Sequence, residues 1–151
     1  MSEPAHVVLA CVIERDGKFL LVEERVNGAL VLNQPAGHWE PGETVFEGAV
    51  REALEETGWY VKLTSFLGIY EYQPDGLPYT FLRIAFVASA ISQRAGHKLD
   101  EGIERAVWMT RDEVVAASAR HRSPMLLRCI DDYLAGRRLP LDIIAHLTPR
   151  K

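Results

Sequence analysis

Cysteine is scarce in this chain, and the two residues that occur form no recognisable pattern. Cys11 and Cys129 are far apart in the sequence, and each lies among apolar residues. Two isolated cysteines make neither a disulfide framework nor a cysteine-based zinc site. We therefore expect both to be buried, reduced thiols.

Long hydrophobic runs and an excess of basic residues are also missing. No apolar stretch approaches the roughly 20 residues that span a bilayer, and the N-terminus lacks a basic segment followed by an apolar one. The 17 Lys and Arg residues are outnumbered by 21 Asp and Glu residues, for a formal net charge of −4. Nucleic-acid binding proteins need a basic face. We therefore expect a cytoplasmic protein that binds neither nucleic acid nor a membrane.

The composition that remains is that of an ordinary globular protein. Hydrophobic residues make up 48% of the 151 residues and charged residues 25%. There are no repeats, low-complexity segments or linkers, and the length suffices for one core that buries most of the unfolded surface. We expect a single domain that covers residues 1–151.

Segments with strand composition alternate with helical ones along the chain. Thr44, Thr110 and Ser123 are candidate helix caps, the last followed by Pro124 at the first helical position. The second predicted helix runs from Thr110 to about Ala119, the third ends near Gly136, and residues 92–102 form a polar loop. The predicted strands are residues 6–14, 18–24, 30–33, 60–72 as one long or two short strands, 79–90 and 105–109. This alternation predicts an α/β (α+β) fold in which a mixed β-sheet packs between helices.

The most informative segment runs from Gly37 to Trp59, with the sequence GHWEPGETVFEGAVREALEETGW. Thr44 and Glu47 have the spacing of a capping box, and Gly58 supplies a left-handed stop. The segment between them is therefore predicted to be a helix. At about 100° per residue, one arc of this helix carries three carboxylates, those of Glu52, Glu55 and Glu56.

This crowding of carboxylates has two interpretations. Like charges one turn apart weaken a helix unless a cation holds them, and a hard divalent ion is the simplest such cation. In an arbitrary protein, however, a solvated acidic face is the commoner explanation. Gly48 lies one turn before Glu52 and costs about 1 kcal/mol relative to alanine inside a helix. Room for a metal and a phosphate against the backbone would explain it.

The spacing of the segment resembles the signature of a known enzyme family. Gly37 is followed by five residues, Glu43, seven residues, and then Arg51-Glu-Ala-Leu-Glu-Glu-Thr-Gly-Trp59. This arrangement resembles the signature of the Nudix hydrolases, which cleave nucleoside diphosphates linked to another group. Every polar position is present, and only Ala53 departs, where the family usually has a larger aliphatic residue. The resemblance implies the Nudix fold and hydrolysis of a phosphoric anhydride bond.

The chain outside the signature is similar to one branch of that family, the NudJ-type phosphatases. The similar segments are residues 6–28, 33–38, 81–86 and 123–144. The branch acts on nucleoside di- and triphosphates and on thiamine-pathway pyrophosphates, such as thiamine pyrophosphate and hydroxymethylpyrimidine pyrophosphate. The resemblance implies release of orthophosphate from such small phosphorylated substrates, with Mg²⁺ as cofactor and Mn²⁺ as a possible substitute. We expect a monomer or a weak homodimer.

Two other functions stay open within the family. One is hydrolysis of a different nucleotide, such as a damaged nucleoside triphosphate, a dinucleoside polyphosphate or an RNA 5′ end. The other is a noncatalytic module that senses a nucleotide. Loss of the metal-binding glutamates would indicate such a module, and all of them are present.

The resemblance also implies roles for individual residues. Glu55 and Glu56 match the paired metal-binding glutamates, and Glu52 matches a third ligand or a residue that holds a nearby water. Gly37 would add its backbone carbonyl to the metal ligands. Glu52 and Glu55 are also candidate catalytic residues.

A second set of residues would support the site. Arg51 and Glu43 match the pair that holds the loop and the helix together, and such a pair would orient the glutamates. Contact with substrate phosphate is the alternative, catalytic role for Arg51. Gly48 and Gly58 would support the site through the helix backbone.

The general base is not settled by the sequence. Many Nudix enzymes supply an acid six residues ahead of a strand tryptophan, but counting back from Trp108 reaches Gly102. Glu101 and Glu104 flank that position, and a small shift in register would bring either towards the metals. Glu104 is therefore the catalytic candidate from this loop, and the helix glutamates are the alternative.

Four residues are candidates for substrate contact because they lie near the ends of elements that face the expected cleft: Trp39, Tyr72, Tyr79 and Arg83. Aromatic rings can stack on a pyrimidine, thiazole or purine, and Arg83 can meet a phosphate. Phe81 is expected to pack in the core, and His38 and His97 are expected to lie in loops.

Overall fold

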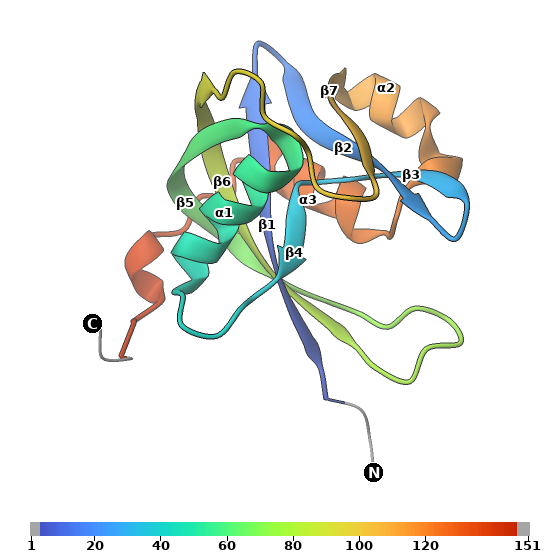
Figure 1. Ribbon diagram of the computed structural model, residues 1–151. Coiled ribbons are helices and arrows are strands. Elements are labelled where there is room, and N and C mark those ends of the chain that lie inside the picture. The colour runs from blue at the N-terminus through green and yellow to red at the C-terminus, as the bar shows by residue number, and fades with distance from the viewer. Residues whose placement is uncertain (1–3, 148–151) are drawn as a thin grey trace.

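The computed structural model describes residues 4–147, so the first three and last four residues of the predicted domain lie outside this range (Figure 1). Within the described range, strands and helices follow the chain in this order: β1 (His6–Arg15), β2 (Lys18–Val26), β3 (Ala29–Asn33), β4 (Ala36–His38), α1 (Val45–Thr57), β5 (Trp59–Tyr72), β6 (Phe81–Gln93), β7 (Ile103–Thr110), α2 (Arg111–Ala116) and α3 (Met125–Leu134). Two short 3₁₀ helices cover Ser118–Arg120 and Leu141–Ile143.

The strands form a mixed sheet. Its order is β3-β2-β1-β6-β5, with β4 paired to β1 and β7 paired to β2. Strands β1 and β6 run parallel, and the other pairs run antiparallel. Figure 1 shows α1 and α3 on opposite sides of these strands. The predicted α/β (α+β) architecture, a mixed sheet between helices, is confirmed.

Alternation along β1 explains why the sheet has a helix on each face. Leu9 and Cys11 pack with Ala49 of α1 in one core cluster. Val12 packs with Leu126 of α3 in the other cluster. Because successive side chains of a strand point to opposite faces, an almost uninterrupted apolar strand needs a partner on both sides.

Most predicted element boundaries agree with the structure, with informative exceptions. Residues 59–72 form one strand whose register shifts in three places against β6. Strand β6 begins at Phe81 instead of Tyr79 and continues to Gln93, since β5 offers it a partner as far as Trp59. The second helix ends at Ala116, and a 3₁₀ turn follows in place of its predicted last turn.

Strand β4 was not predicted, and His38 is its last residue, so the expectation of a loop histidine is wrong. Only three residues form β4, all paired with β1, and so short a segment has no recognisable alternation. Ser123 Oγ accepts a hydrogen bond from the Met125 amide, although α3 is assigned from Met125 itself. The pairing of β4 with β1 brings Gly37 beside Leu9, and it thereby places the start of the signature segment.

The expectation for the cysteines is confirmed. Cys11 and Cys129 are both buried and free. Burial raises the pKa of the Cys11 thiol to about 12. None of the helices in residues 4–147 is both long and apolar enough to cross a membrane.

Candidate active site

The ends of α1 are set by local chemistry, as predicted. The Thr44 hydroxyl accepts from the Glu47 amide, and the Glu47 carboxylate accepts from the Thr44 amide. At the other end Gly58 has φ +77°, and its amide donates to the Leu54 carbonyl. The left-handed conformation favours glycine and stops the helix. These caps set where α1 begins and ends.

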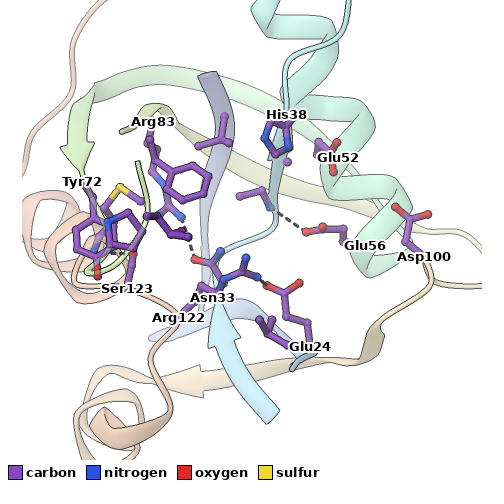
Figure 2. A pocket seen from close by; sticks show the side chains of 18 of the residues that line it. Glu24, Asn33, His38, Glu52, Glu56, Tyr72, Arg83, Asp100, Arg122 and Ser123 are labelled. Carbon is purple, nitrogen blue, oxygen red and sulfur yellow. Dashed lines mark hydrogen bonds and ion pairs between the residues drawn. The ribbon is translucent and has the colours of Figure 1, made fainter. Parts of the chain in front are cut away.

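A cleft of about 780 Å³ lies beside the acidic side of α1. Figure 2 shows Glu52, Glu56 and Asp100 at one end and Arg83 and Tyr72 towards the other. Six carboxylates and two arginines are among the described residues that line it: Glu24, Glu40, Glu52, Glu55, Glu56, Asp100, Arg83 and Arg122. The cleft lining therefore contains more carboxylates than arginines, with Glu52, Glu56 and Asp100 gathered at one end.

Glu56 is aimed at β4 and is not solvated. It is 9% exposed, and its Oε1 accepts a hydrogen bond of 2.9 Å from the Ala36 amide. Burial, with the nearby Glu52 charge, raises the Glu56 pKa to about 9, because the Ala36 bond offsets only part of the desolvation. A solvated acidic helix face does not describe this carboxylate.

Glu52 is also buried, and it lies directly against Gly37. A Cβ atom added to Gly37 would be 2.2 Å from the Glu52 carboxyl carbon, which is far too close. Gly37 is thus required by this close approach and not by a turn, since it lies within β4. Burial raises the pKa of the Glu52 carboxyl, although Arg51 lowers it in part.

Glu55 and Asp100 complete the acidic end. Asp100 is a loop residue that was not among the candidates from the sequence. Carboxylate oxygens of Glu52, Glu55 and Asp100 all lie within 4.8 Å of one another. The Asp100 amide donates to the Glu55 carbonyl at 3.2 Å, which attaches the loop before β7 to the end of α1. Burial and the Asp100 charge raise the pKa of Glu55.

The acidic end fits a divalent cation. Its donors are carboxylate oxygens, the ligands that Mg²⁺ and related hard cations prefer. Their raised pKa values show that negative charge is costly there when only protein groups are present. A bound cation would remove that cost.

Residue counting does not reach Asp100, which lies eight residues before Trp108. The register between β2 and β7 shifts by one residue, since Glu23 pairs with Arg105 and Glu24 pairs with Ile103, which leaves Glu104 as an extra residue in a bulge. This bulge would move the count only from Gly102 to Glu101. The Asp-Glu-Gly sequence of residues 100–102 was the available signal, because it favours a turn that begins at Asp100.

Glu104 is not brought to the acidic end. It is exposed and pairs with Arg25 at 2.9 Å, and neither it nor Glu101 lines the cleft. The loop that was expected to supply a base does reach the glutamates, but Asp100 is its acid nearest to them. The structure therefore corrects the choice of Glu104.

Arg51 forms the predicted pair with Glu43, and its contacts extend further. Two hydrogen bonds of 2.9 and 2.7 Å join its Nε and Nη2 to the two Glu43 carboxylate oxygens. Its Nη1 donates to Glu52 at 2.8 Å and to Glu55 at 3.2 Å. One guanidinium thus connects the loop before α1 with two acids of the cleft, an arrangement suited to holding them in position.

Gly48 supports the site for a reason other than the expected one. A Cβ atom there would meet Leu9 Cδ1 at 2.4 Å and Glu43 Oε1 at 2.7 Å. The space beside Gly48 is therefore occupied by the core and by Glu43, so it leaves no room for a metal and a phosphate. The missing side chain at Gly48 lowers helix propensity, but it allows α1 to pack closely on β1.

Three of the four predicted substrate contacts line the cleft, namely Tyr72, Tyr79 and Arg83. Trp39 does not; it is 46% exposed, and its indole Nε1 donates to the Glu43 carbonyl. Phe81 packs against the core as expected, yet it also lines the cleft.

The cleft also contains polar residues that sequence reasoning did not select. Asn33, Ser123, Glu24 and Arg122 line it, and Arg122 donates to Glu24 at 2.5 Å (Figure 2). These residues come from β3, β2 and the turn before α3. No pattern in any one segment indicates that they lie together.

Arg83 lies in a buried environment. It is 2% exposed and donates to the Gln34 side-chain oxygen at 2.6 Å and to the Asn33 side-chain oxygen at 2.9 Å. Its Nε has no hydrogen-bond partner, and no carboxylate within residues 4–147 pairs with it. A buried charge without a counter-charge is costly.

Comparison with known proteins agrees with this geometry. The NUDIX domain model matches residues 3–129. The phosphatases NudJ of Escherichia coli O1:K1 and of E. coli strain K12 are each 39% identical over 140 residues, which is 92% of this chain and 90% of theirs.

Solved structures show the same fold. A Nudix hydrolase from Nitrosomonas europaea superimposes with a TM-score of 0.93 at 46% identity, covering 95% of this chain and 98% of its own. A MutT protein from Methanosarcina mazei shares the fold at 19% identity, with a TM-score of 0.70 over 91% of this chain and 99% of its own. Since the signature helix, the mixed sheet and these matches agree, the chain belongs to the Nudix family of hydrolases, which act on pyrophosphate bonds.

Proposed function

We propose that this protein is a magnesium-dependent phosphatase of small organic pyrophosphates, with Mn²⁺ as a possible substitute. Its substrates would be nucleoside di- and triphosphates and thiamine-type pyrophosphates, among them thiamine pyrophosphate and hydroxymethylpyrimidine pyrophosphate, with release of orthophosphate. The single observation that carries the metal-dependent chemistry is the group of close carboxylates from Glu52, Glu55 and Asp100. The similarity to proteins named phosphatase NudJ supports the choice of substrates.

The cation would be held by Glu52, Glu55 and Glu56, with the Gly37 carbonyl as a further ligand. When bound, it would neutralise charge on the substrate phosphate and lower the pKa of a water molecule. Arg51 holds Glu52 and Glu55 through direct hydrogen bonds. Because Arg51 is itself held by Glu43, the acids would keep their positions when a highly charged substrate enters.

Asp100 is our proposed acceptor for the proton of the attacking water. It comes from the loop and not from α1, and it is exposed while Glu52 and Glu56 are buried. An exposed carboxylate in contact with water can take up and release a proton during each turnover. Glu55 is the alternative acceptor on the helix.

The proposals for location, oligomeric state, domain count and partners rest on the composition and charge of the sequence. The protein would act in the cytoplasm as a monomer or weak homodimer of a single domain, and it would bind neither nucleic acid nor a membrane. The acidic lining of the cleft supports small phosphorylated substrates bound together with a cation, since phosphate alone would be repelled.

A phosphate-release screen tests the proposal. Purified protein is incubated with thiamine pyrophosphate, hydroxymethylpyrimidine pyrophosphate and nucleoside di- and triphosphates, and orthophosphate is measured with malachite green, with and without added inorganic pyrophosphatase. We expect orthophosphate without the added enzyme and none after chelation of divalent ions. Phosphate that appears only with inorganic pyrophosphatase would mean that pyrophosphate is released, and the phosphatase assignment would be wrong.

A further inference from the structure

The loop of residues 94–102, between β6 and β7, brings Asp100 to the acidic end of the cleft. One oxygen of its carboxylate lies within 4.8 Å of carboxylate oxygens of Glu52 and Glu55 (Figure 2). Like charges at such distances repel one another. The loop therefore needs contacts that hold Asp100 in place against this repulsion.

Backbone hydrogen bonds attach the two ends of this loop. The Arg94 amide donates at 2.7 Å to the carbonyl of Gly58, which follows α1. At the other end, the Arg25 amide of β2 donates to the Gly102 carbonyl at 2.8 Å. These bonds determine where the loop starts and ends, but its middle, which includes Asp100, depends on other contacts.

The middle of the loop is attached to a single carbonyl of α1, that of Glu55. The final carbonyls of an α-helix have no amide partner inside the helix, and Glu55 lies in the last turn of α1. Its carbonyl accepts from the Asp100 amide at 3.2 Å and contacts His97 Nε2 at 3.2 Å. Since a carbonyl can only accept, His97 Nε2 carries the hydrogen. The loop thus fills a position that the helix leaves free.

His97 lies in this loop, as predicted, and within residues 4–147 it forms the only side-chain hydrogen bond of the loop. It is half-buried, whereas the adjacent Lys98 is exposed. A Cβ atom added to Gly58 would be 3.5 Å from the His97 ring, so the ring also lies against the end of α1. The imidazole therefore occupies the space between the loop and the helix.

His97 does not take part in the cleft itself. It is not among the described residues that line the cleft, and its Nε2 is already bonded to the Glu55 carbonyl. A substrate in the cleft meets Asp100 and not His97. Any effect of His97 on the reaction must therefore pass through the position of the loop.

We propose that His97 is a positioning residue of this enzyme and holds Asp100 beside the glutamates of α1. It donates a hydrogen bond to the Glu55 carbonyl and thereby attaches the middle of the loop to the helix. That carbonyl belongs to the same residue as one of the carboxylates that Asp100 faces, so the loop is attached at the point where repulsion acts on it. The inference rests on the proposed function in taking Asp100 as the proton acceptor.

Two substitutions separate the hydrogen bond from the imidazole ring. His97→Ala removes the donor, and His97→Gln replaces it by an amide nitrogen. The substrate is the one that is hydrolysed fastest in the phosphate-release screen. We expect His97→Ala to lower kcat roughly tenfold with KM within about twofold, because rate falls steeply when a catalytic group is displaced. His97→Gln should recover most of the lost kcat, and a His97→Gln enzyme as slow as His97→Ala would overturn the proposal.

A double-mutant cycle decides whether His97 acts through Asp100. In Asp100→Asn protein, adding His97→Ala should lower kcat by less than about twofold, since the group that His97 positions is already disabled. Lys98→Ala, at the exposed neighbouring position, is the matched control and should keep the wild-type kcat. The same tenfold loss in both backgrounds would show that His97 acts independently of Asp100, and a normal kcat in His97→Ala would show that the loop needs no such attachment. Either result overturns the proposal.

Exchange of the Asp100 amide with water tests the attachment without catalysis. In ¹⁵N-labelled protein without divalent ions, we expect this amide to exchange about tenfold faster in His97→Ala than in the wild type, because the loop opens more often. Lys98→Ala should exchange like the wild type, and an unchanged rate in His97→Ala would contradict the proposal. No substrate or metal is present, so the result is separate from that of the phosphate-release screen. A protein that hydrolyses none of the screened substrates would still show whether His97 holds the loop.

Discussion

The acidic end of the cleft and the opposite end, where Arg83 contacts Asn33 and Gln34, both contain charged residues, but the chain builds them differently. At the acidic end, Glu52, Glu55 and Glu56 come from one helical stripe, and only Asp100 is added from elsewhere. The opposite end joins the end of β3 to the middle of β6, and the contacting residues are about 50 positions apart in sequence.

The two ends also differ in what they lack. Carboxylates crowd the acidic end, and their pKa values are raised because burial and like charges disfavour ionisation. At the other end, the partners of the buried Arg83 within residues 4–147 are neutral: Asn33, Gln34 and Cys129. The two ends therefore differ in the sign of their charge.

The largest expected effect comes from removing one charge at the acidic end. Glu55→Gln should lower turnover roughly 1,000-fold or more, the scale of a single catalytic group, while the protein stays folded. Steady-state kinetics and circular dichroism measure both. Glu71→Gln, at an exposed position of β5, is the matched control. Near-normal turnover in folded Glu55→Gln protein would contradict the role given to the acidic end.

The next largest effect on turnover is expected from Asp100, the loop residue at the acidic end. Asp100→Asn should lower turnover roughly 100-fold, whereas Glu104→Gln should stay within about twofold, because Glu104 pairs with Arg25 away from the cleft. A pH–rate profile of each variant accompanies the turnover numbers. A larger loss in Glu104→Gln than in Asp100→Asn would restore the original choice of Glu104 and contradict the geometry.

Substitution of two glycines distinguishes the placement of the acids from the packing of the core. Gly37→Ala pushes on the Glu52 carboxylate, so activity should fall roughly 10- to 100-fold, as expected when a reacting group moves by about an ångström. Its stability should change by less than about 1 kcal/mol, since the Cβ meets the end of one side chain and no backbone.

Gly48→Ala should instead lower stability. Alanine gains about 1 kcal/mol in helix propensity, but overpacking against buried Leu9 costs about 1–3 kcal/mol and outweighs that gain. Urea unfolding and kinetics of the two variants provide the comparison. A stabilised Gly48→Ala protein, or a Gly37→Ala protein with normal activity, would show that the neighbouring side chains move to accommodate the added methyl group.

A further prediction concerns the pH dependence of stability in protein freed of divalent ions. The Glu56 pKa is raised to about 9 in the folded state, against an ordinary value of 4.5 for a glutamate, so the folded protein binds more protons between these limits. Stability should therefore fall as pH rises from about 4.5 towards 9. Glu56→Gln should flatten this slope in thermal unfolding scans, and Glu71→Gln should keep it. The same slope in both variants would mean that other groups cause it.

Local patterns were enough to predict much of the acidic end. The capping box at Thr44 and the stop at Gly58 are both present, because each depends on residues close in sequence. The Arg51–Glu43 pair, which the family resemblance implied, is present as well. Asp100 was missed because it lies eight residues before Trp108, whereas the count ended at the sixth residue, Gly102. The reason for Gly48 was missed because Leu9, its neighbour, lies on another element.

The end of the cleft that contains Arg83 was predicted poorly, because its contacts join residues that are far apart in sequence. Arg83 was noted as a polar residue in an apolar strand, and it does line the cleft. Its partners Asn33 and Gln34 could not be identified, since no local spacing relates β3 to β6. Trp39 was chosen for its place in the sequence, but its hydrogen bond to the Glu43 carbonyl keeps it on the loop before α1.

By itself, the sequence determined the helix, its stripe of carboxylates and the family to which the chain belongs, because these depend on spacing within one continuous segment. Only the tertiary structure decided which loop acid joins the glutamates, why Gly37 and Gly48 must be small, and that Arg83 is buried beside Asn33 with no carboxylate partner among residues 4–147. Helical periodicity is a local property of the chain. Contacts between strands and loops depend on register and packing, which arise only when the whole chain folds.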